Sequence, residues 1–201
     1  MYTGIVAGKA PVISIVEGGE VRRITVDLNG FEENLDVGAS VALDGICMTV
    51  VDIDAGLVGF DAIAETLHRT TLSEREEGDL LNVERSLRMG DELGGHLLSG
   101  HVMCTAEIIG KEEVGAGLDL KISISDETLP YILEKGFIAV DGMSLTVGEM
   151  DESGFYLHII PETLRITTIG GKSVGDRVNI EIDSRTQAIV DTIERRRGMS
   201  E

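Results

Sequence analysis

The sequence contains no apolar run of the roughly 18 residues that a membrane-spanning helix needs. Its first residues, MYTGIVAGKA, do not place an apolar stretch after a basic start, so they predict no signal peptide. Cysteine is also scarce, and Cys47 and Cys104 form neither a CxxC pair nor the spacing of a zinc site. We therefore expect a cytoplasmic protein with no membrane partner, no metal and, in a reducing compartment, no disulfide.

Basic residues are few as well. The chain has 17 Lys and Arg against 36 Asp and Glu, a formal net charge of −19. Such a field repels nucleic acid, which excludes it as an expected partner. Only five of the cations are lysines, and the acids are spread along the chain as on a folded surface. An acid-rich, lysine-poor surface suggests a halophilic protein, and the alternative is an ordinary acidic one, because charge bears on solubility rather than fold.

One phrase occurs twice in the chain. Residues 44–50 read DGICMTV, and residues 141–147, at a shift of 97 positions, read DGMSLTV. Further matches are ETL at 65–67 with ETL at 162–164 and, at a shift of 96, Gly4 and Val6 with Gly100 and Val102. A period this long in only two copies indicates tandem domains rather than a solenoid. We place the copies at residues 1–97 and 98–185, with a tail at 186–201.

Each copy predicts β-structure. Short β-branched runs such as PVISIV and FIAVDGMSLTV are bounded by Gly, Asp or Pro. Asp44-Gly45 and Asp141-Gly142, each flanked by apolar residues, predict tight hairpin turns. The fold class is therefore all-β: two tandem six-stranded Greek-key barrels. The tail predicts a C-terminal α-helix, with Ile189, Val190 and Ile193 on one side.

Small polar residues follow each Asp-Gly turn. Alternation along a strand puts Ser144 and Thr146 on one face, and Cys47 and Thr49 take their places in the first copy. These groups could form a binding wall, or they could merely satisfy local backbone groups, as Ser and Thr often do. The ETL segments leave a similar choice between a ligand loop and a capped turn.

Two histidines lie in the connection GGHLLSGHV at residues 94–102. His96 and His101 are five positions apart, which is not one helical face, and no third ligand is evident. Hydrogen bonding between the two domains is therefore the favoured role, and a metal site is the weaker alternative.

In these segments the chain resembles the riboflavin synthase family, which has two lumazine-binding domains. The resemblance rests on MYTGIV, ASVALDGICMTV, FDAIAETL, NVERSL, GGHLLSGHV, KGFIAVDGMSLTV, IIPETLRITT and NIEIDSRTQAIVDTIER. It covers essentially the whole length. The family usually has phenylalanine at the second position, where this chain has Tyr2, and we expect little effect of the added hydroxyl.

The resemblance implies a transferase of riboflavin biosynthesis that needs no cofactor. Two molecules of 6,7-dimethyl-8-ribityllumazine exchange a four-carbon unit, which gives riboflavin and 5-amino-6-(D-ribitylamino)uracil. It also implies a homotrimer held by the C-terminal helix, with the reacting pair stacked between the first barrel of one subunit and the second barrel of a neighbour.

The resemblance further implies a set of site residues. The catalytic candidates are Cys47, His101, Ser144, Thr146 and Asp183. The substrate-binding candidates are Gly4, Ile5, Val6, Ser40, Cys47, Met48, Thr49, Asp61, Ala62, Ile63, Ala64, Glu65, Thr66, Gly100, His101, Val102, Lys135, Ser144, Leu145, Thr146, Ile159, Ile160, Pro161, Glu162, Thr163 and Leu164. We expect Ser144, Thr146 and Asp183 to orient or activate one lumazine. Cys47 and His101 would assist from the opposite side, and Lys135 would bind ring or ribityl oxygens.

Two other functions stay open. One is a lumazine- or flavin-binding protein without catalysis, like the fluorescent antenna relatives of this family. The other is a flavin-dependent reductase on a similar barrel. The reductase is disfavoured because no GxGxxG opens a helix after a strand.

Overall fold

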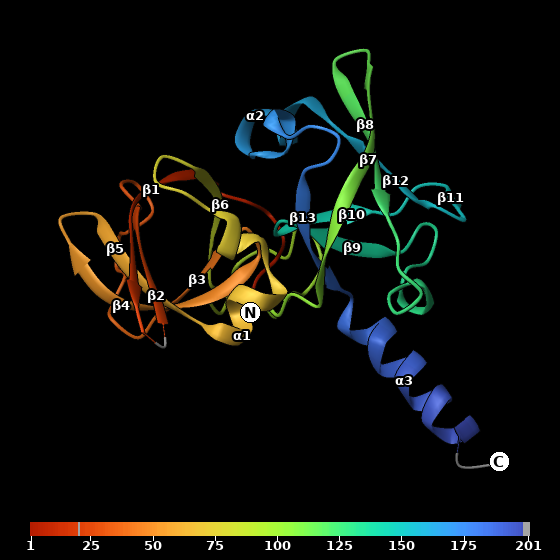
Figure 1. The fold of residues 1–201 in the computed structure, drawn as a ribbon, viewed down its shortest axis with the longest axis horizontal. Coiled ribbons are helices and arrows are strands. Elements are labelled where there is room, and N and C mark those ends of the chain that lie inside the picture. The colour runs from red at the N-terminus through yellow and green to blue at the C-terminus, as the bar shows by residue number, and fades with distance from the viewer. Residues whose placement is uncertain (20, 199–201) are drawn as a thin grey trace.

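Short antiparallel strands joined by tight turns build both halves of the chain (Figure 1). The computed structural model describes residues 1–19 and 21–198. The strands of the first half are β1 (Gly8–Gly18), β2 (Val21–Asp27), β3 (Ser40–Leu43), β4 (Ile46–Asp54), β5 (Leu57–Ile63) and β6 (Leu80–Arg85). They close into a barrel in the order β1-β2-β5-β4-β3-β6. Helix α1 (Ala64–Arg69) and the 3-10 helix η1 (Thr71–Glu74) connect β5 to β6.

The second half repeats this plan. Its elements are β7 (Cys104–Val114), β8 (Gly117–Ser123), η2 (Leu129–Tyr131), β9 (Phe137–Val140), β10 (Met143–Thr146), β11 (Met150–Asp151), β12 (Gly154–Ile159), α2 (Pro161–Ile166), η3 (Ile169–Gly171) and β13 (Arg177–Ile182). The sheet order is β10-β9-β13-β7-β8-β12-β11. Where the first half has the continuous strand β4, the second has the two pieces β10 and β11. This half therefore has seven strands rather than the six that we predicted.

The interruption between β10 and β11 falls at Gly148. Glycine in a strand interior weakens the strand, because it has no side chain to pack. Backbone bonds from Gly148 N to Tyr156 O (2.8 Å) and from Tyr156 N to Glu149 O (2.9 Å) keep this stretch against β12. The second sheet thus follows the path of the first barrel with one local break.

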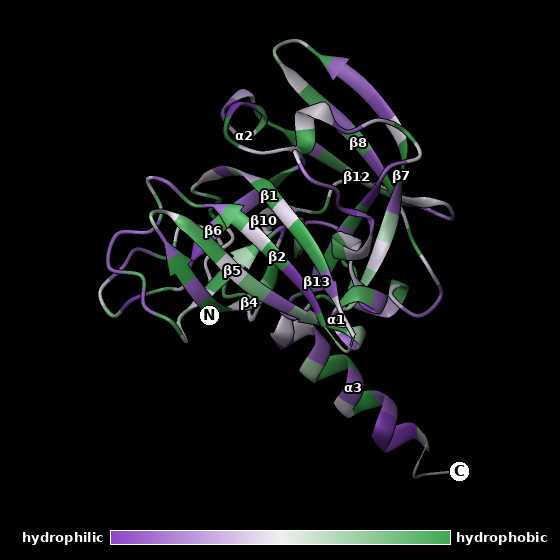
Figure 2. Ribbon diagram, turned by 60° about the vertical axis from the view of Figure 1, so that its left-hand side comes forward, coloured by the Kyte–Doolittle hydropathy of each residue, from purple (hydrophilic) through white to green (hydrophobic). Residues whose placement is uncertain are grey.

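Each half has its own hydrophobic core. Buried and exposed residues alternate along strands such as β2, and Figure 2 shows the matching alternation of hydropathy. Val6 belongs to the core of the second half, although it lies at the start of the chain. Val102, which follows the first half, packs against the core of the first. We call residues 1–7, before β1, and residues 98–103, before β7, the leading segments of the two copies. These leading segments are therefore exchanged between the halves.

An approximate two-fold relationship organises this exchange. Tyr2 and Leu98 form a two-way backbone bridge, with N-to-O distances of 2.9 and 3.0 Å. Glu84 on β6 accepts from the backbone of Thr3 (2.6 Å), and Glu181 on β13 accepts from that of Ser99 (2.7 Å). Each buried carboxylate thus anchors the leading segment of its own copy. Because that segment then crosses onto the other half, the anchors hold the exchange in place.

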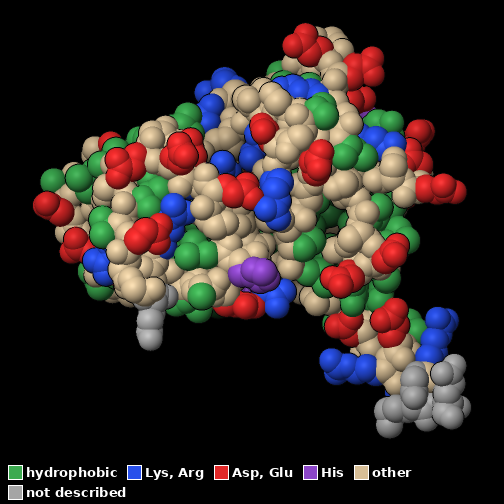
Figure 3. All heavy atoms as spheres, viewed as in Figure 1, with side chains coloured by type: hydrophobic (Ala, Val, Ile, Leu, Met, Phe, Trp, Pro, Cys, Tyr) green, Lys and Arg blue, Asp and Glu red, His purple; other side chains and the backbone are tan. Residues whose placement is uncertain are grey.

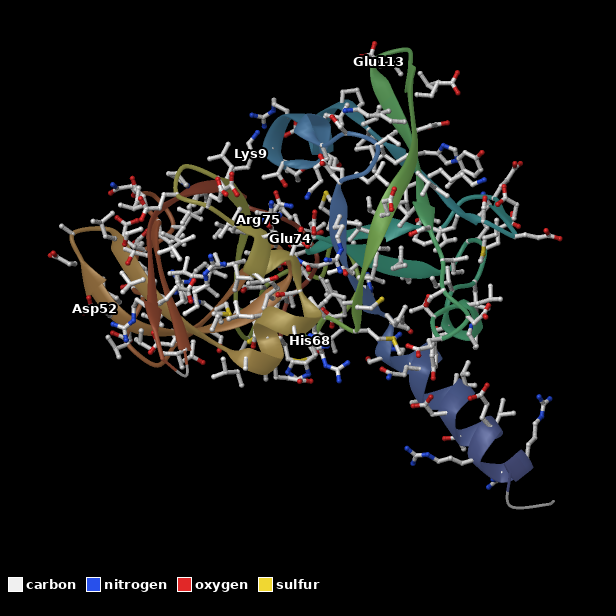
Figure 4. The ribbon with its side chains drawn as sticks, viewed as in Figure 1. Lys9, Asp52, His68, Glu74, Arg75 and Glu113 are labelled. Carbon is white, nitrogen blue, oxygen red and sulfur yellow. The ribbon has the colours of Figure 1, made fainter. Side chains whose placement is uncertain are left out.

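The predicted Asp-Gly turns are confirmed, and they meet at the interface between the halves. Positive φ angles of 46° at Asp44 and 79° at Gly45 are matched by 45° at Asp141 and 81° at Gly142, as in a type I′ turn. The Asp44 carboxylate is fully buried and pairs with Arg75 at 2.8 Å. Figure 4 shows Arg75 between the two halves.

Two asparagines bind these turns across the interface. Asn82 Nδ2 donates to Asp141 O (2.9 Å), and Asn179 Nδ2 donates to Asp44 O (3.0 Å). A further link runs from Lys9 Nζ to Arg165 O at 3.2 Å, and Figure 4 shows Lys9 extending toward α2. Neither half is therefore a free-standing barrel.

Helix α3 (Ser184–Gly198) projects away from the rest of the molecule (Figure 1). It begins two residues before the predicted tail, and residues 199–201 of that tail lie outside the described residues. Ile189 and Ile193 on this helix are 61% and 48% exposed.

Among the described residues, none of the helices combines the length and the apolar character that a membrane span requires. Acidic side chains are scattered over both halves in Figure 3.

Candidate active site

The first group of predicted residues lies on strand β4. Cys47 is half-buried, Met48 is buried in the core and Thr49 is exposed, which is the alternation that the sequence predicts. Ser40 pairs with Thr49 across β3 and β4. Small polar groups from two neighbouring strands thus lie side by side on the first half.

The exchanged segment around Gly100 covers one side of Cys47. Cys47 N donates to Gly100 O at 2.9 Å. Gly100 has φ of +78°, and a Cβ there would lie 2.6 Å from the Cβ of Cys47. Only glycine permits this close approach in the left-handed region. His101 follows Gly100 directly in the chain and has an exposed side chain.

The second group lies on strand β10. Ser144 N donates to Gly4 O at 2.8 Å, as Cys47 N does to Gly100 O. A cavity of about 80 Å³ opens here. It is lined by Gly4, Ile5, Val6, Met143, Ser144, Leu145, Thr163, Ile166 and Thr167. Met143, Ile166 and Thr167 are absent from the predicted set; Met143 directly precedes Ser144, and Ile166 and Thr167 lie shortly after Leu164.

The ETL segments form the first turns of α1 and α2. The Thr70 hydroxyl donates to Thr66 O at 2.7 Å, and that of Thr167 donates to Thr163 O at 2.6 Å. These bonds close the two helix ends through residues that follow the ETL segments, so the choice between a ligand loop and a capped turn stays open. Ile160, the N-cap residue of α2, is 62% exposed.

The predicted acidic ligand residues are engaged by arginines at the surface. Arg23 holds the pKa of Asp61 below its usual range through a side-chain hydrogen bond. Glu65 and Glu162 have lowered pKa values for the same reason, next to Arg69 and Arg165 respectively. Ala62 and Ile159 pack into the barrel cores. The side chains of these five positions are thus engaged within the chain, in ion pairs or in the cores.

Asp183 and Lys135 flank the second group. Asp183 Oδ1 accepts from Thr186 N at 2.8 Å and from the Thr186 hydroxyl at 3.1 Å, so it is the N-cap of α3. Lys135 is exposed, and its backbone N donates to Val147 O at 2.9 Å, directly after β10. Lys135 thus adjoins the end of the strand that carries Thr146.

The structure adds His96 to the site. Its Nδ1 lies 2.6 Å from Ser144 Oγ, and its ring stacks on Phe137 with centroids 5.0 Å apart. Burial lowers the pKa of His96, while the nearby Asp183 opposes that shift. Nε2 is buried and has no hydrogen-bond partner among the described residues. His96 N also donates to Thr3 O at 3.1 Å within the first copy. The bond of its ring to Ser144 joins the two copies, and this partner was not predicted.

Cys47 has a ring neighbour of a different kind. The Tyr2 hydroxyl donates to Cys47 Sγ at 3.2 Å. Tyr2 corresponds to Leu98 in the second copy, which has no polar side-chain group. The two copies therefore present different chemistry at matching places: phenol and thiol in one, imidazole and hydroxyl in the other.

No three His, Cys, Asp or Glu side chains of residues 1–19 and 21–198 gather as they would around a metal ion. The site thus consists of small hydroxyl, thiol and imidazole groups beside backbone amides. Such groups can hold a planar polar ring and move protons on its edge.

Comparisons with known proteins show the family of the chain. The family model of the lumazine binding domain matches residues 3–86 and 99–183. The riboflavin synthase of Escherichia coli (strain K12) is 49% identical over 198 residues, which cover 97% of this chain and 92% of that protein. The riboflavin synthase of Chlamydia pneumoniae is 48% identical over 165 residues, which cover 82% and 80%.

Solved structures show the same fold. LumP complexed with riboflavin has a TM-score of 0.84 and 26% identity, over 92% of this chain and 100% of that chain. LumP complexed with 6,7-dimethyl-8-(1'-D-ribityl) lumazine has a TM-score of 0.83 and 24% identity, with the same coverage. The chain therefore belongs to the lumazine-binding domain family, together with the riboflavin synthases that it matches along nearly its whole length.

Proposed function

We infer that the chain catalyses the riboflavin synthase reaction. Two molecules of 6,7-dimethyl-8-ribityllumazine exchange a four-carbon unit and yield riboflavin and 5-amino-6-(D-ribitylamino)uracil. The observation that carries this inference is the match with curated riboflavin synthases at up to 49% identity over nearly the full chain. The duplicated polar groups on β4 and β10 give it a physical basis.

Two like substrates suit two like half-sites. The cavity beside Ser144 measures about 80 Å³. Pockets that enclose a drug-sized ligand usually measure about 300–1,000 Å³, so this one can hold only the edge of a bicyclic ring. The remaining face of that ring is then free to stack on a second lumazine. Holding the pair face to face makes a bimolecular step effectively unimolecular.

The second half-site is suited to proton transfer. The reaction requires a methyl group on the lumazine ring to lose a proton, and the anion that forms spreads over the ring. We assign Ser144 and the neutral imidazole of His96 to this transfer, because they are hydrogen-bonded at 2.6 Å. Asp183 lies near enough to His96 to favour its protonated form as the proton arrives.

Other predicted residues have supporting roles in this proposal. Cys47, Thr49 and His101 on the first half-site assist addition and proton transfer to the second lumazine. Thr146 orients the ring on the second half-site, and Lys135 binds its oxygens. Backbone amides of the ETL segments bind the ring carbonyls, where they stabilise developing negative charge.

The reacting pair is proposed to stack between the first half of one subunit and the second half of a neighbour in a homotrimer. The exposed isoleucines of α3 support this assembly, because a projecting helix with an apolar side needs a partner. A cytoplasmic location stays a prediction, as does the absence of any cofactor.

Incubation of the purified chain with 6,7-dimethyl-8-ribityllumazine, with no metal or cofactor added, tests the reaction. We expect one riboflavin for every two lumazines consumed, followed by absorbance and chromatography. The non-catalytic alternative predicts a change in lumazine fluorescence with no riboflavin formed, and that result would overturn the proposed reaction.

A further inference from the structure

We propose that Tyr2 is a positioning residue for Cys47, whose thiol it holds in the first half-site by a hydrogen bond. The proposal rests on the proposed function in so far as Cys47 takes part in the reaction. The hydroxyl of Tyr2 lies 3.2 Å from Cys47 Sγ, a distance at which an O–H donates to sulfur.

The surroundings fix Tyr2 tightly. Its side chain is 1% exposed and belongs to a small apolar cluster between the halves, with Ala42, Leu98 and Ala139. Its backbone is held by the two-way bridge with Leu98. The ring also passes close to Gly100, because a Cβ on that glycine would lie 2.9 Å from Tyr2 Cε2. The phenol therefore holds its hydroxyl toward Cys47, with Ser40 as a second polar side chain within its reach.

The chemistry makes Tyr2 a permanent donor. Burial, the hydrogen bond to Cys47 and nearby negative charge on Cys47 and Glu84 all raise the pKa of Tyr2 well above its usual range. The hydroxyl consequently keeps its proton at any physiological pH. The bond from this donor strengthens when negative charge develops on the sulfur during a reaction, since hydrogen bonds to charged groups are stronger than those to neutral ones.

Geometry limits the thiol as well. Cys47 N is bonded to Gly100 O at 2.9 Å, and the Cβ of Cys47 faces the bare Cα of that glycine. With its backbone fixed and one sulfur lone pair occupied by Tyr2, the thiol keeps one orientation toward the half-site. In the second copy Ser144 is held by a different ring, His96, so each polar residue of the pair has its own support.

The test uses the full chain with Tyr2→Phe, which removes only the hydroxyl. Alkylation of Cys47 by iodoacetamide is measured in a Cys104→Ala background, so that a single cysteine reacts. Loss of the donor should slow alkylation near neutral pH by roughly threefold to tenfold, the range that one ordinary intramolecular hydrogen bond implies. Tyr156→Phe, a tyrosine on β12 outside the site, is the matched control and should leave the rate unchanged.

Steady-state kinetics provide a second readout. Tyr2→Phe should lower kcat by a similar factor with little change in KM. In a Cys47→Ala background the same substitution should have no further effect on kcat, because Tyr2 acts through the thiol. Equal losses in both backgrounds, or unchanged alkylation in Tyr2→Phe, would overturn the proposal. A wild-type chain that forms no riboflavin would overturn the proposed function instead, and alkylation would still decide the role of Tyr2.

Discussion

The imidazole Nδ1 of His96 lies 2.6 Å from the hydroxyl of Ser144, and the two residues are 48 positions apart in the chain. The contact exists because the connection between β6 and β7, which contains His96, passes beside strand β10. It brings a titratable base into hydrogen-bonding distance of Ser144. Cys47, which takes the place of Ser144 in the first copy, is bonded to the Tyr2 hydroxyl instead of a histidine.

His96→Gln should therefore lower kcat by roughly 100-fold, the lower end of what a positioned acid or base contributes, with a smaller change in KM. Burial lowers the pKa of His96, so the neutral, proton-accepting form persists below its ordinary pKa of about 6.5. The acid limb of the wild-type kcat profile should accordingly lie below that value. His158→Gln, an exposed histidine paired with Asp119, is the control. A His96→Gln enzyme with wild-type kcat would contradict the assignment.

Asp183 has a second task as the N-cap of α3, and two substitutions separate its roles. Asp183→Asn retains a good capping oxygen and removes the charge, so turnover should fall while the helix keeps its stability. Asp183→Ala should also cost about 1 kcal/mol of stability through the lost cap. Ser86→Ala, at the matching position of the first copy, should be nearly silent. Kinetics and thermal unfolding of the three variants check this, and equal turnover in Asp183→Asn and wild type would argue against a catalytic charge.

The interface between the halves should be more stable in mild acid. Burial, followed by the neighbouring Asp141, raises the pKa of Asp44 to about 6, although Arg75 opposes the shift. A raised carboxyl pKa gives stability that is fully present below the unfolded value and is lost as pH rises through the folded value. The unfolding free energy of wild type relative to Asp44→Asn should thus increase by roughly 1–2 kcal/mol between about pH 7.5 and about pH 5.

Urea unfolding of both proteins at the two pH values measures this difference. Asp52→Asn, on an exposed part of β4, is the control and should show no such trend relative to wild type. A gap between wild type and Asp44→Asn that stays constant or shrinks on acidification would contradict the prediction.

Helix α3 should be required for assembly. Deletion of residues 186–201 should give a monomer with little activity, because it removes the exposed isoleucines Ile189 and Ile193 that are proposed to pack on neighbouring subunits. The milder variant Ile189→Asp leaves the helix in place and should also weaken association. Sedimentation velocity checks both, and a truncated chain that still sediments as a trimer would show that other surfaces hold the assembly.

The isolated first copy, residues 1–97, should pair with itself. Its leading segment packs on the second half, and its own core is completed by Val102, so the fragment alone lacks both contacts. Two fragments can supply them to one another through the same approximate two-fold axis. We expect a dimer that binds lumazine or riboflavin and turns over very little. A monomeric, fully folded fragment in sedimentation would show that the exchange is dispensable.

Much of the fold was predictable because the two copies align with almost no gaps, at shifts of 96 and then 97 positions. The shift of 97 places α2 on α1 and β13 on β6 residue for residue, and the shift of 96 does the same for β7 and β8 on β1 and β2. Strand periodicity and the Asp-Gly turns are local properties, so the sequence reports them directly. The break at Gly148 is local too, but the repeat concealed it.

The contacts that cross between copies could not be predicted in the same way. Periodicity says which face of a segment is apolar, but it does not say which barrel that face covers, and so the position of Val6 was missed. Matching the copies also did not reveal the role of His96, because only the fold brings its ring to Ser144. Tyr2 looked interchangeable with phenylalanine because only the fold brings its hydroxyl to Cys47.

The approximate two-fold axis has a consequence for the history of the chain. A single copy that exchanged its leading segment would form a symmetric pair, in which every mutation appears at both sites at once. Fusion of two such copies into one chain removes that constraint while leaving the packing unchanged. After fusion, one site could keep a thiol where the other has a hydroxyl, and a donor and an acceptor could diverge on a scaffold that began as two identical parts.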